Sequence, residues 1–188
     1  MFRGIHEFNI DSKGRTTVPS RFRELLAETQ AISQPTLFPL EESKPIGGEQ
    51  LMFSFMDQFE PEQPVAQGPE RSERMMITTG LDPCLVAYTM EAWERFETRL
   101  ASLSQFDPAV VRLKRLYVAP ATEVTFDKQG RLLIPANLRE YAGLEHDIVW
   151  AGMVTTLELW SGKRWKEQRA QALADIQSVA EALTTLGL

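Results

Sequence analysis

Hydrophobic and polar residues alternate through FRGIHEFNI at residues 2–10, and the alternation stops at the polar stretch DSKGR, residues 11–15. A period of two predicts a strand. The polar stretch predicts a tight turn, because Gly14 can adopt a positive φ and Asp11 can bond backbone groups two residues further on. A strand resumes at TTV, and Pro19 suits the first position of a helix over PSRFRELLAE. The chain therefore opens with a hairpin followed by a helix.

The same succession returns in the second half of the chain. ATEVTF predicts a strand, DKQGR at 127–131 a turn, and RLLI a second strand. PANLREYA predicts a short helix that closes at Gly143, since glycine readily takes the left-handed conformation that ends a helix. Further strands are predicted at CLVAY, DIVWA and TLELW. Together these elements indicate an α+β fold.

Apolar residues at helical spacing predict three more helices. One runs from Met90 to Leu103, and a second follows an Asp107–Pro108 cap and reaches Tyr117. The last is a single long helix with Ser161 as its cap and an apolar side. That side consists of Trp165, Leu173, Ile176, Val179 and Leu183.

The two hairpins and their flanks are copies of one pattern. Sliding the chain by 116 residues aligns Asp11 with Asp127, Gly14 with Gly130, Arg15 with Arg131, Pro19 with Pro135 and Arg23 with Arg139. A slide of 72 aligns Gly80 with Gly152, Leu85 with Leu157, Tyr88 with Trp160 and Trp93 with Trp165. A tandem duplication is the simplest interpretation. Because the slides differ by 44 residues, the first copy carries an insertion at about 33–75, with one short strand predicted at 51–56.

Composition narrows the class of protein. Apolar residues make up 43% of the 188, enough for a packed core, and a single cysteine favours a reducing compartment. We found no apolar run typical of a signal peptide or a membrane span, so a cytoplasmic protein is expected. The net charge of −6 argues against nucleic acid, but it is uneven. Residues 1–25 hold five basic and three acidic side chains, whereas residues 39–63 hold one basic and six acidic side chains.

Candidate catalytic chemistry is sparse. The chain has no phosphate-binding loop, no nucleophile elbow and no zinc-protease motif. His6, His146 and Cys84 lack the spacing of a zinc site, so we expect no metal and no cofactor. Asp11 and Asp127 could be paired carboxylates of an enzyme, but an arginine beside each should keep it ionised and a poor acid. No catalytic residue is predicted.

The repeated turn DxxGR has two interpretations. In one, Asp and Arg merely brace a hairpin, since Asp and Gly are common in turns for backbone reasons alone. In the other, Asp orients Arg, which then loses less entropy when it binds a guanine edge or a phosphate. Gly and Asp suffice for a turn, so an arginine at the same offset in both copies favours the second interpretation.

The motifs MFRG, DSKGR…VPSRFR, DKQGRLLIPANLREYAGL and ELWSGKRW resemble the MraZ family of bacterial transcriptional regulators. This resemblance implies a tandem-duplicated swapped-hairpin β-barrel of the AbrB/MazE type with flanking helices. It implies a homo-oligomeric ring that binds short direct repeats in the promoter of the division and cell-wall gene cluster. Through the D-x-x-x-R motif it also assigns DNA contact to Asp11 and Arg15, and to Asp127 and Arg131.

On this basis we expect four segments: a first repeat at 1–103, a connecting helix at 104–118, a second repeat at 119–165 and a C-terminal helix at 166–188. The expected partners are double-stranded DNA and further copies of the chain, without a membrane or a small-molecule substrate, at the nucleoid. The candidate DNA-binding residues are Arg3, Asp11, Lys13, Arg15, Asp127, Lys128 and Arg131. The alternative is an antitoxin-like module on the same fold that binds another protein.

Overall fold

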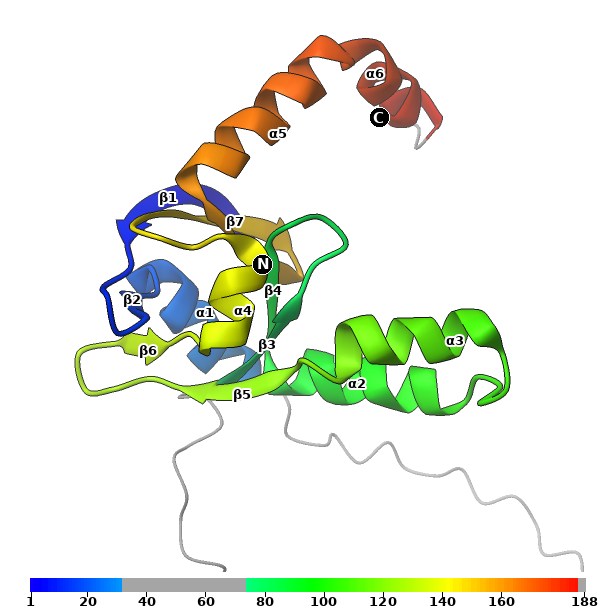
Figure 1. Cartoon of the computed structure of the whole chain (residues 1–188), viewed down its shortest axis with the longest axis horizontal. Helices are drawn as coiled ribbons and strands as arrows, with labels where there is room; N and C mark the ends of the chain where they lie inside the picture. Colours follow the sequence, from blue (N-terminus) through cyan, green and yellow to red (C-terminus); the bar gives the residue numbers. More distant parts are fainter. Residues whose placement is uncertain (32–73, 186–188) are drawn as a thin grey trace, which may run out of the picture.

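The computed structural model describes residues 1–31 and 74–185. The short strand predicted at 51–56 and the rest of the predicted insertion therefore lie outside the described residues, apart from its last two positions. The described part is a mixed α/β fold with antiparallel strands at its centre and helices around it (Figure 1).

The main sheet has six strands in the order β1-β7-β8-β4-β3-β5, and every neighbouring pair is antiparallel. A separate two-stranded ribbon pairs β2 with β6. The strands are β1 Phe2–Asn9, β2 Arg15–Thr17, β3 Arg74–Thr79, β4 Leu85–Tyr88, β5 Thr122–Thr125, β6 Arg131–Leu133, β7 Asp147–Val154 and β8 Thr156–Ser161.

Strands of the two sequence repeats interlock. The first strand of each repeat pairs with a later strand of the other, β1 with β7 and β5 with β3. The β2–β6 ribbon is centred on Thr16 opposite Leu132, which the 116-residue offset relates to each other. The β4–β8 pairing is likewise centred on Val86 opposite Glu158, related by the offset of 72. Both registers are those that a twofold relation between the repeats requires.

The strand registers correct one detail of the sequence alignment. Val124 pairs with Met75 as Phe8 pairs with Ile148, so β3 and β7 correspond at an offset of 73 rather than 72. The offset of 72 holds for β4 and β8. The difference arises between equivalent pairs of the two hairpins: five residues, 80–84, separate Thr79 from its partner Leu85, whereas four, 153–156, separate Gly152 from Leu157.

The predicted closed β-barrel is not confirmed. Among the described strands, the main sheet ends at β1 on one side and β5 on the other, and β2 with β6 forms a pair of its own. The two DxxGR turns separate the short strands β2 and β6 from β1 and β5. Alternation within each strand does not indicate which strand it pairs with, so it did not predict this division into a sheet and a ribbon.

The hydrophobic core lies between the main sheet, the ribbon and two helices. Helix α1, Ser20–Ala31, buries Phe22 and Leu26 there, and α4, Ala136–Ala142, buries Leu138 and Ala142. Trp150 on β7 is the largest fully buried side chain. As predicted, α4 ends at Gly143, whose φ of 61° is left-handed. The two DxxGR turns are therefore attached to the same hydrophobic core.

Two helices form an arm that extends away from the sheet (Figure 1). Helix α2, Met90–Ala101, and helix α3, Pro108–Leu113, correspond to the predicted pair, and Asp107 caps α3 by accepting the Ala109 N–H at 2.7 Å. The second helix continues as a π-helix, Lys114–Val118, rather than as the regular helix predicted. Thr78 on β3 donates its hydroxyl to the Tyr117 carbonyl, which anchors this wide turn to the sheet.

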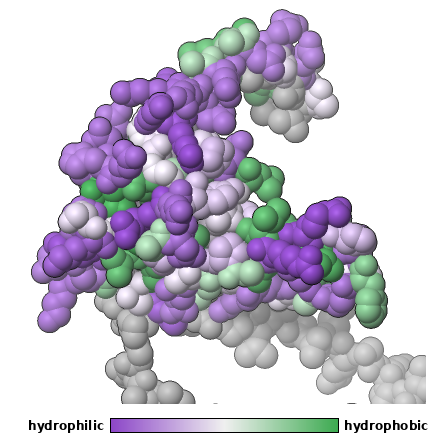
Figure 2. Space-filling view, viewed as in Figure 1, coloured by the Kyte–Doolittle hydropathy of each residue, from purple (hydrophilic) through white to green (hydrophobic). Residues whose placement is uncertain are grey.

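The C-terminal segment is two helices, not the single one predicted. Helix α5, Gly162–Ala174, begins at the predicted cap Ser161, and helix α6, Ile176–Thr185, follows after a break. Asp175 leaves helical geometry, with φ −107° and ψ 40°, and its carboxylate accepts the Ser178 hydroxyl at 2.7 Å. The visible face of α5 is mostly hydrophilic (Figure 2). The predicted apolar side is largely uncovered within the described chain: Leu173, Ile176 and Leu183 are exposed.

Candidate nucleic-acid interface

The first DxxGR turn holds Arg15 by its own aspartate. Asp11 Oδ1 accepts the backbone N–H groups of Lys13, at 2.9 Å, and Arg15, at 2.8 Å. Asp11 Oδ2 accepts Arg15 Nε at 2.8 Å and forms an ion pair with Nη2 at 2.8 Å. Gly14, with φ 87°, lets the chain reverse between them. One carboxylate thus closes the turn and orients the guanidinium.

The second turn repeats this arrangement. Asp127 Oδ1 accepts the N–H groups of Gln129 and Arg131, both at 2.9 Å, and Oδ2 accepts Arg131 Nε at 2.8 Å. Arg131 Nη2 pairs with the same oxygen at 2.8 Å and also donates to Gln129 Oε1 at 3.3 Å. Gly130 has φ 72°. In both copies the aspartate therefore contacts and orients the arginine, as the repeated spacing predicts.

Hydrogen bonding lowers the pKa of both aspartates below the ordinary 3.8, and the largest cause is the backbone N–H of the arginine four residues on. A lowered folded pKa stabilises the turn above pH 3.8, and this stabilisation is lost as the pH falls through the lowered value.

We therefore predict that carboxyl NMR titration of Asp11 gives a pKa below 3.8 that rises in Arg15→Ala without reaching 3.8. The reason is that the alanine variant keeps the backbone N–H of residue 15, which is the largest cause of the shift. A full return to the ordinary pKa in Arg15→Ala would instead make the guanidinium the main cause.

Each turn is braced by an arginine from the other repeat's helix region. Arg139 Nε donates to the Ile134 carbonyl at 3.2 Å and lies against Gly14, and Arg23 Nε donates to the Val18 carbonyl at 3.3 Å and lies against Gly130. Arg23 and Arg139 thus brace the two turns. These contacts also explain why both turns need glycine, since a Cβ would collide with the bracing side chain.

Gly14→Ala should destabilise the protein more than Gly130→Ala. Both positions have a positive φ, which costs a non-glycine residue on the order of 1–3 kcal/mol. At Gly14 the added Cβ would also stand 2.9 Å from the backbone oxygen of Ile134, which cannot move away alone. At Gly130 the nearest atoms belong to the mobile end of Arg23. Urea denaturation of both variants measures the difference, and equal midpoints would contradict this explanation.

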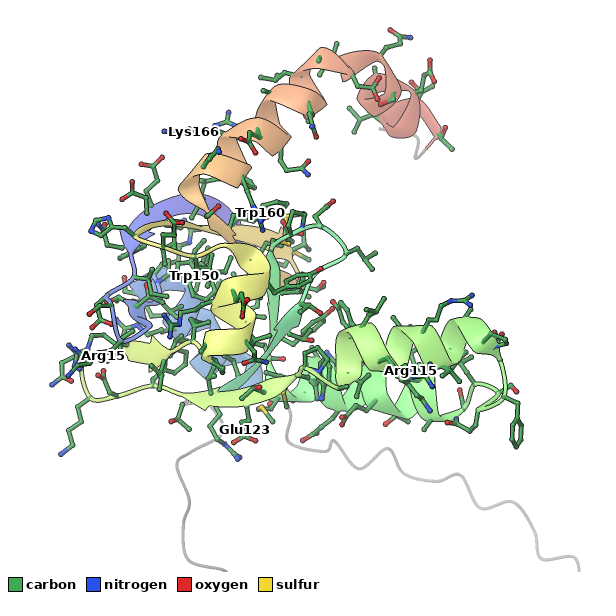
Figure 3. The ribbon with its side chains drawn as sticks, viewed as in Figure 1. Arg15, Arg115, Glu123, Trp150, Trp160 and Lys166 are labelled. Carbon is green, nitrogen blue, oxygen red and sulfur yellow. The ribbon has the colours of Figure 1, made fainter. Side chains whose placement is uncertain are left out.

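The β2–β6 ribbon connects the two turns, because each of its strands begins at one of them. Thr16 and Leu132 are buried at its centre, so the alternate residues Arg15, Thr17, Arg131 and Leu133 share the opposite, outward face. The side chains of Arg15 and Arg131 are 41% and 40% exposed, so each is held yet accessible. Figure 3 shows Arg15 at the margin of the molecule, far from Arg115 on the helical arm.

Next to this face lies a hollow of about 480 Å³. Arg15 and Arg131 line it together with Asp11, and Glu145 and His146 from the connection after α4 line it as well. The His146 carbonyl accepts the Ile10 N–H at 2.8 Å, which ties this connection to the first turn. Two arginines thus border one recess, where each could donate to an anion or a base edge.

Six of the seven candidate residues lie in the two turns, one turn at each end of the β2–β6 ribbon. Lys13 and Lys128 are exposed at the two turn tips, beside the Asp–Arg pairs. Arg3 lies at the other end of β1, roughly 20 Å from the first turn at the usual strand rise, and Nη2 donates to the sulfur of Met1 at 3.7 Å. Thr17 and Leu133, which share this outward face, were not among the residues predicted from the sequence. The alternation around the buried Thr16 and Leu132 was the signal that could have revealed them.

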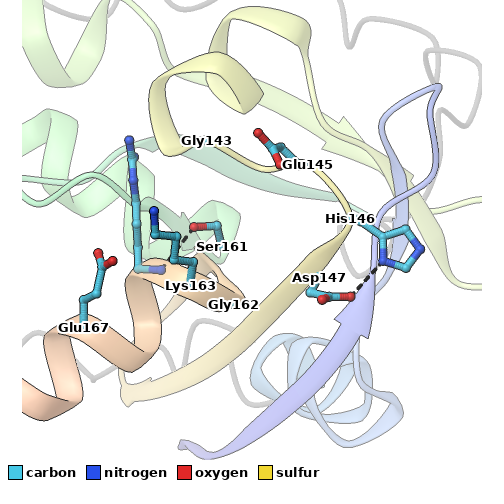
Figure 4. Close-up of a pocket in the computed structure, with 9 residues that line it drawn as sticks. Gly143, Glu145, His146, Asp147, Ser161, Gly162, Lys163 and Glu167 are labelled. Carbon is cyan, nitrogen blue, oxygen red and sulfur yellow. Dashed lines mark hydrogen bonds and ion pairs between the residues drawn. The ribbon is translucent and has the colours of Figure 1, made fainter.

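A second hollow, of about 370 Å³, lies at the start of α5 (Figure 4). Glu145, Asp147 and Glu167 balance Lys163 and Arg164 around it, and His146 pairs with Asp147 at 2.8 Å. Arg164 is engaged by the Pro83 and Tyr141 carbonyls, at 3.1 and 3.0 Å. Because the acidic side chains around this hollow outnumber the basic ones and Arg164 is already hydrogen-bonded, it offers little to an anion.

Other chemistry is not supported within residues 1–31 and 74–185. No group of three or more His, Cys, Asp or Glu side chains in these ranges could hold a metal ion. Burial raises the pKa of the Cys84 thiol to about 12, so it is protonated and a poor nucleophile. No helix of this described part is both long enough and apolar enough to cross a membrane.

Comparison with known proteins gives a consistent family. Residues 1–34 and 117–186 match a family model described as "MraZ protein, putative antitoxin-like". The chain is 34% identical over 188 residues to the transcriptional regulator MraZ of Acetivibrio thermocellus, with all of both chains covered. It is 34% identical over 188 residues to that of Desulfitobacterium hafniense strain Y51, again over all of both chains, and 33% identical to that of Hydrogenovibrio crunogenus, over all of this chain and 98% of the relative.

The accessible pair of aspartate-held arginines on the ribbon defines a candidate binding surface. The chain belongs to the MraZ family. Its relatives are named transcriptional regulators, which is a non-enzymatic function, and the chain is placed with them rather than with enzymes.

Proposed function

We propose that this chain regulates transcription by binding specific double-stranded DNA with the outward face of its β2–β6 ribbon. The observation that carries the proposal is the pair Arg15 and Arg131 on one exposed face, each held by its own aspartate. The major groove of DNA admits a two-stranded β-ribbon, and arginine forms paired hydrogen bonds with the edge of guanine. Arg15 and Arg131 read guanines, and Lys13 and Lys128 bind flanking phosphates.

Holding the arginines in advance favours specific binding. A free arginine side chain loses about 2 kcal/mol of rotamer entropy when it is fixed. Here Asp11 and Asp127 have already fixed Nε and Nη2 in the free protein. Nη1 of Arg15 has no hydrogen bond within the described structure, so an edge of the guanidinium is available for a base.

The interlocked strands support a swapped-hairpin duplication of the AbrB/MazE type. In this proposal each repeat contributes one hairpin, and the hairpins exchange partners through β1–β7 and β5–β3. The repeats extend over 1–103 and 119–165, with a connecting helical segment at 104–118 and a C-terminal segment at 166–188. Duplication places two equivalent arginines on one chain, where a single hairpin would supply one.

The active form in this proposal is a homo-oligomeric ring at the nucleoid. A net charge of −6 opposes DNA binding, and one ribbon offers few basic contacts. Several ribbons that engage several promoter repeats together raise avidity by roughly 10²–10⁴. The exposed Leu173 and Ile176 on the C-terminal helices suit contacts between subunits. The target is the promoter of the division and cell-wall gene cluster.

A second candidate function is an antitoxin-like module that binds another protein. The exposed apolar side of α5 and α6 favours it, because that side could equally receive a different chain. The first function is preferred because the α5–α6 surface offers no explanation for two aspartate-held arginines on the ribbon.

The test is a fluorescence-anisotropy titration of labelled duplex from upstream of this gene, with scrambled duplex as control, at two salt concentrations. We expect tighter binding to the native duplex, and a log–log slope against salt of about −0.9 for each phosphate contact. Equal affinity for both duplexes at low salt would overturn the proposal and direct the search to protein partners.

A further inference from the structure

The outward face of the ribbon is not symmetric. The 116-residue offset relates Arg15 to Arg131 and Thr17 to Leu133, so the arginines match and their neighbours do not. In the ribbon register Arg15 lies directly opposite Leu133, and Arg131 directly opposite Thr17. Side chains directly opposite each other have Cβ atoms about 4.5–5.5 Å apart. One arginine therefore has leucine as its nearest cross-strand neighbour, and the other has threonine.

Leu133 is 55% exposed, directly opposite Arg15 and two residues along the strand from Arg131. A single exposed leucine is ordinary on a protein surface. This one, however, stands on the same narrow face as both arginines, where any ligand that contacts Arg15 also meets it. An apolar side chain in the major groove recognises the 5-methyl group of thymine.

The turn tips break the symmetry in the same way. The first tip reads Ser12-Lys13 and the second Lys128-Gln129, so the lysine stands one residue earlier in the second. One residue moves the Cα atom that carries the lysine by about 3.8 Å along the chain. Both the face and the tips of the ribbon thus differ between its two halves.

From this asymmetry we propose that Leu133 is a specificity-determining residue that contacts the methyl group of a thymine beside the guanine read by Arg15. Thr17 occupies the equivalent place beside Arg131 and makes a weaker apolar contact. The inequality fixes the orientation of each subunit on the DNA, so the recognised box is asymmetric. This inference rests on the proposed function, and it adds the residue that distinguishes the two ends of the box.

The test is selection from a random duplex library with wild type, Leu133→Thr and the control Leu116→Thr. Leu133→Thr makes the two halves of the ribbon face alike, and threonine is well tolerated in a strand. Leu116 is an exposed leucine on the helical arm and gives the same chemical change away from the ribbon. We expect wild type and Leu116→Thr to select an asymmetric box with thymine beside guanine, and Leu133→Thr to lose the thymine preference while it keeps the guanine.

A second measurement replaces that thymine by uracil, which removes only the methyl group. Burial of one methyl group corresponds to about a fourfold change in affinity. We expect a loss of about fourfold for wild type and less than twofold for Leu133→Thr. The reciprocal variant Thr17→Leu should gain a thymine preference beside the other guanine.

The outcomes separate the two levels of the proposal. A wild-type selection that enriches no sequence would overturn the proposed function itself. An enriched box whose thymine preference is the same in wild type and Leu133→Thr, with equal uracil losses, would overturn the role of Leu133 alone.

Discussion

Replacing Arg15 and Arg131 together by alanine should abolish sequence-specific DNA binding and leave the fold intact. One well-placed arginine–guanine pair provides about 1–3 kcal/mol of discrimination, so two lost pairs, about 2–6 kcal/mol, weaken binding by roughly 30-fold to 10⁴-fold. The loss is increased because Asp11 and Asp127 then face the DNA phosphates without their arginines. Both arginines are partly exposed and outside the core, so the free energy of unfolding should change little.

The matched control is Arg115→Ala. Arg115 is exposed on the helical arm, away from the ribbon (Figure 3), and its loss changes the net charge as each single arginine variant does. Anisotropy titrations of the double variant, the two single variants and this control distinguish the effect of the ribbon position from the effect of losing one positive charge. Binding of the double variant within threefold of wild type, or an equal loss in Arg115→Ala, would contradict the ribbon interface.

Trp150→Ala should cost about 3–5 kcal/mol of unfolding free energy, the largest effect expected for one core residue. Trp150 is fully buried on β7, in the core cluster that also holds Ile134 and Leu138. Its indole N–H has no hydrogen-bond partner among the described residues. Trp150→Phe therefore removes an unpaired polar group as well as volume, and it should cost much less than Trp150→Ala.

Trp160→Phe is the comparison for this pair. Trp160 is also buried, but its Nε1 donates to Glu158 Oε2 at 2.8 Å, so phenylalanine removes a hydrogen bond that is made. Urea denaturation should rank Trp150→Ala as least stable, with Trp150→Phe the milder of the two phenylalanine variants. A Trp150→Phe cost equal to that of Trp150→Ala would show that the indole N–H is satisfied in solution.

Local features of the fold were predictable because short-range chemistry determines them. Asp and Gly at fixed spacing specify the turn, Asp107 and Ser161 cap helices as predicted, and Gly143 ends α4. The orientation of Arg15 by Asp11 was predictable for the same reason, since the two are only four residues apart.

Long-range features were not predictable. The pairing of β2 with β6 joins segments 116 residues apart, and periodicity within either strand contains no information about its partner. For this reason the pairing of Arg15 with Leu133 was not predicted, and the barrel that the resemblance implies is not confirmed by the described strands. The break at Asp175 was not predicted because apolar spacing does not reveal local polar contacts. One such contact at the break is the hydrogen bond from the Ser178 hydroxyl to the Asp175 carboxylate.

The most direct test of the central claim replaces each guanine of the bound duplex in turn by 7-deazaguanine, which removes only the N7 acceptor in the major groove. If Arg15 and Arg131 read guanines there, one substitution weakens wild type at least fivefold and leaves Arg15→Ala unchanged, and another behaves likewise for Arg131→Ala. Equal losses in wild type and both variants would mean that these arginines do not contact the bases, and that the ribbon does not read DNA in the major groove.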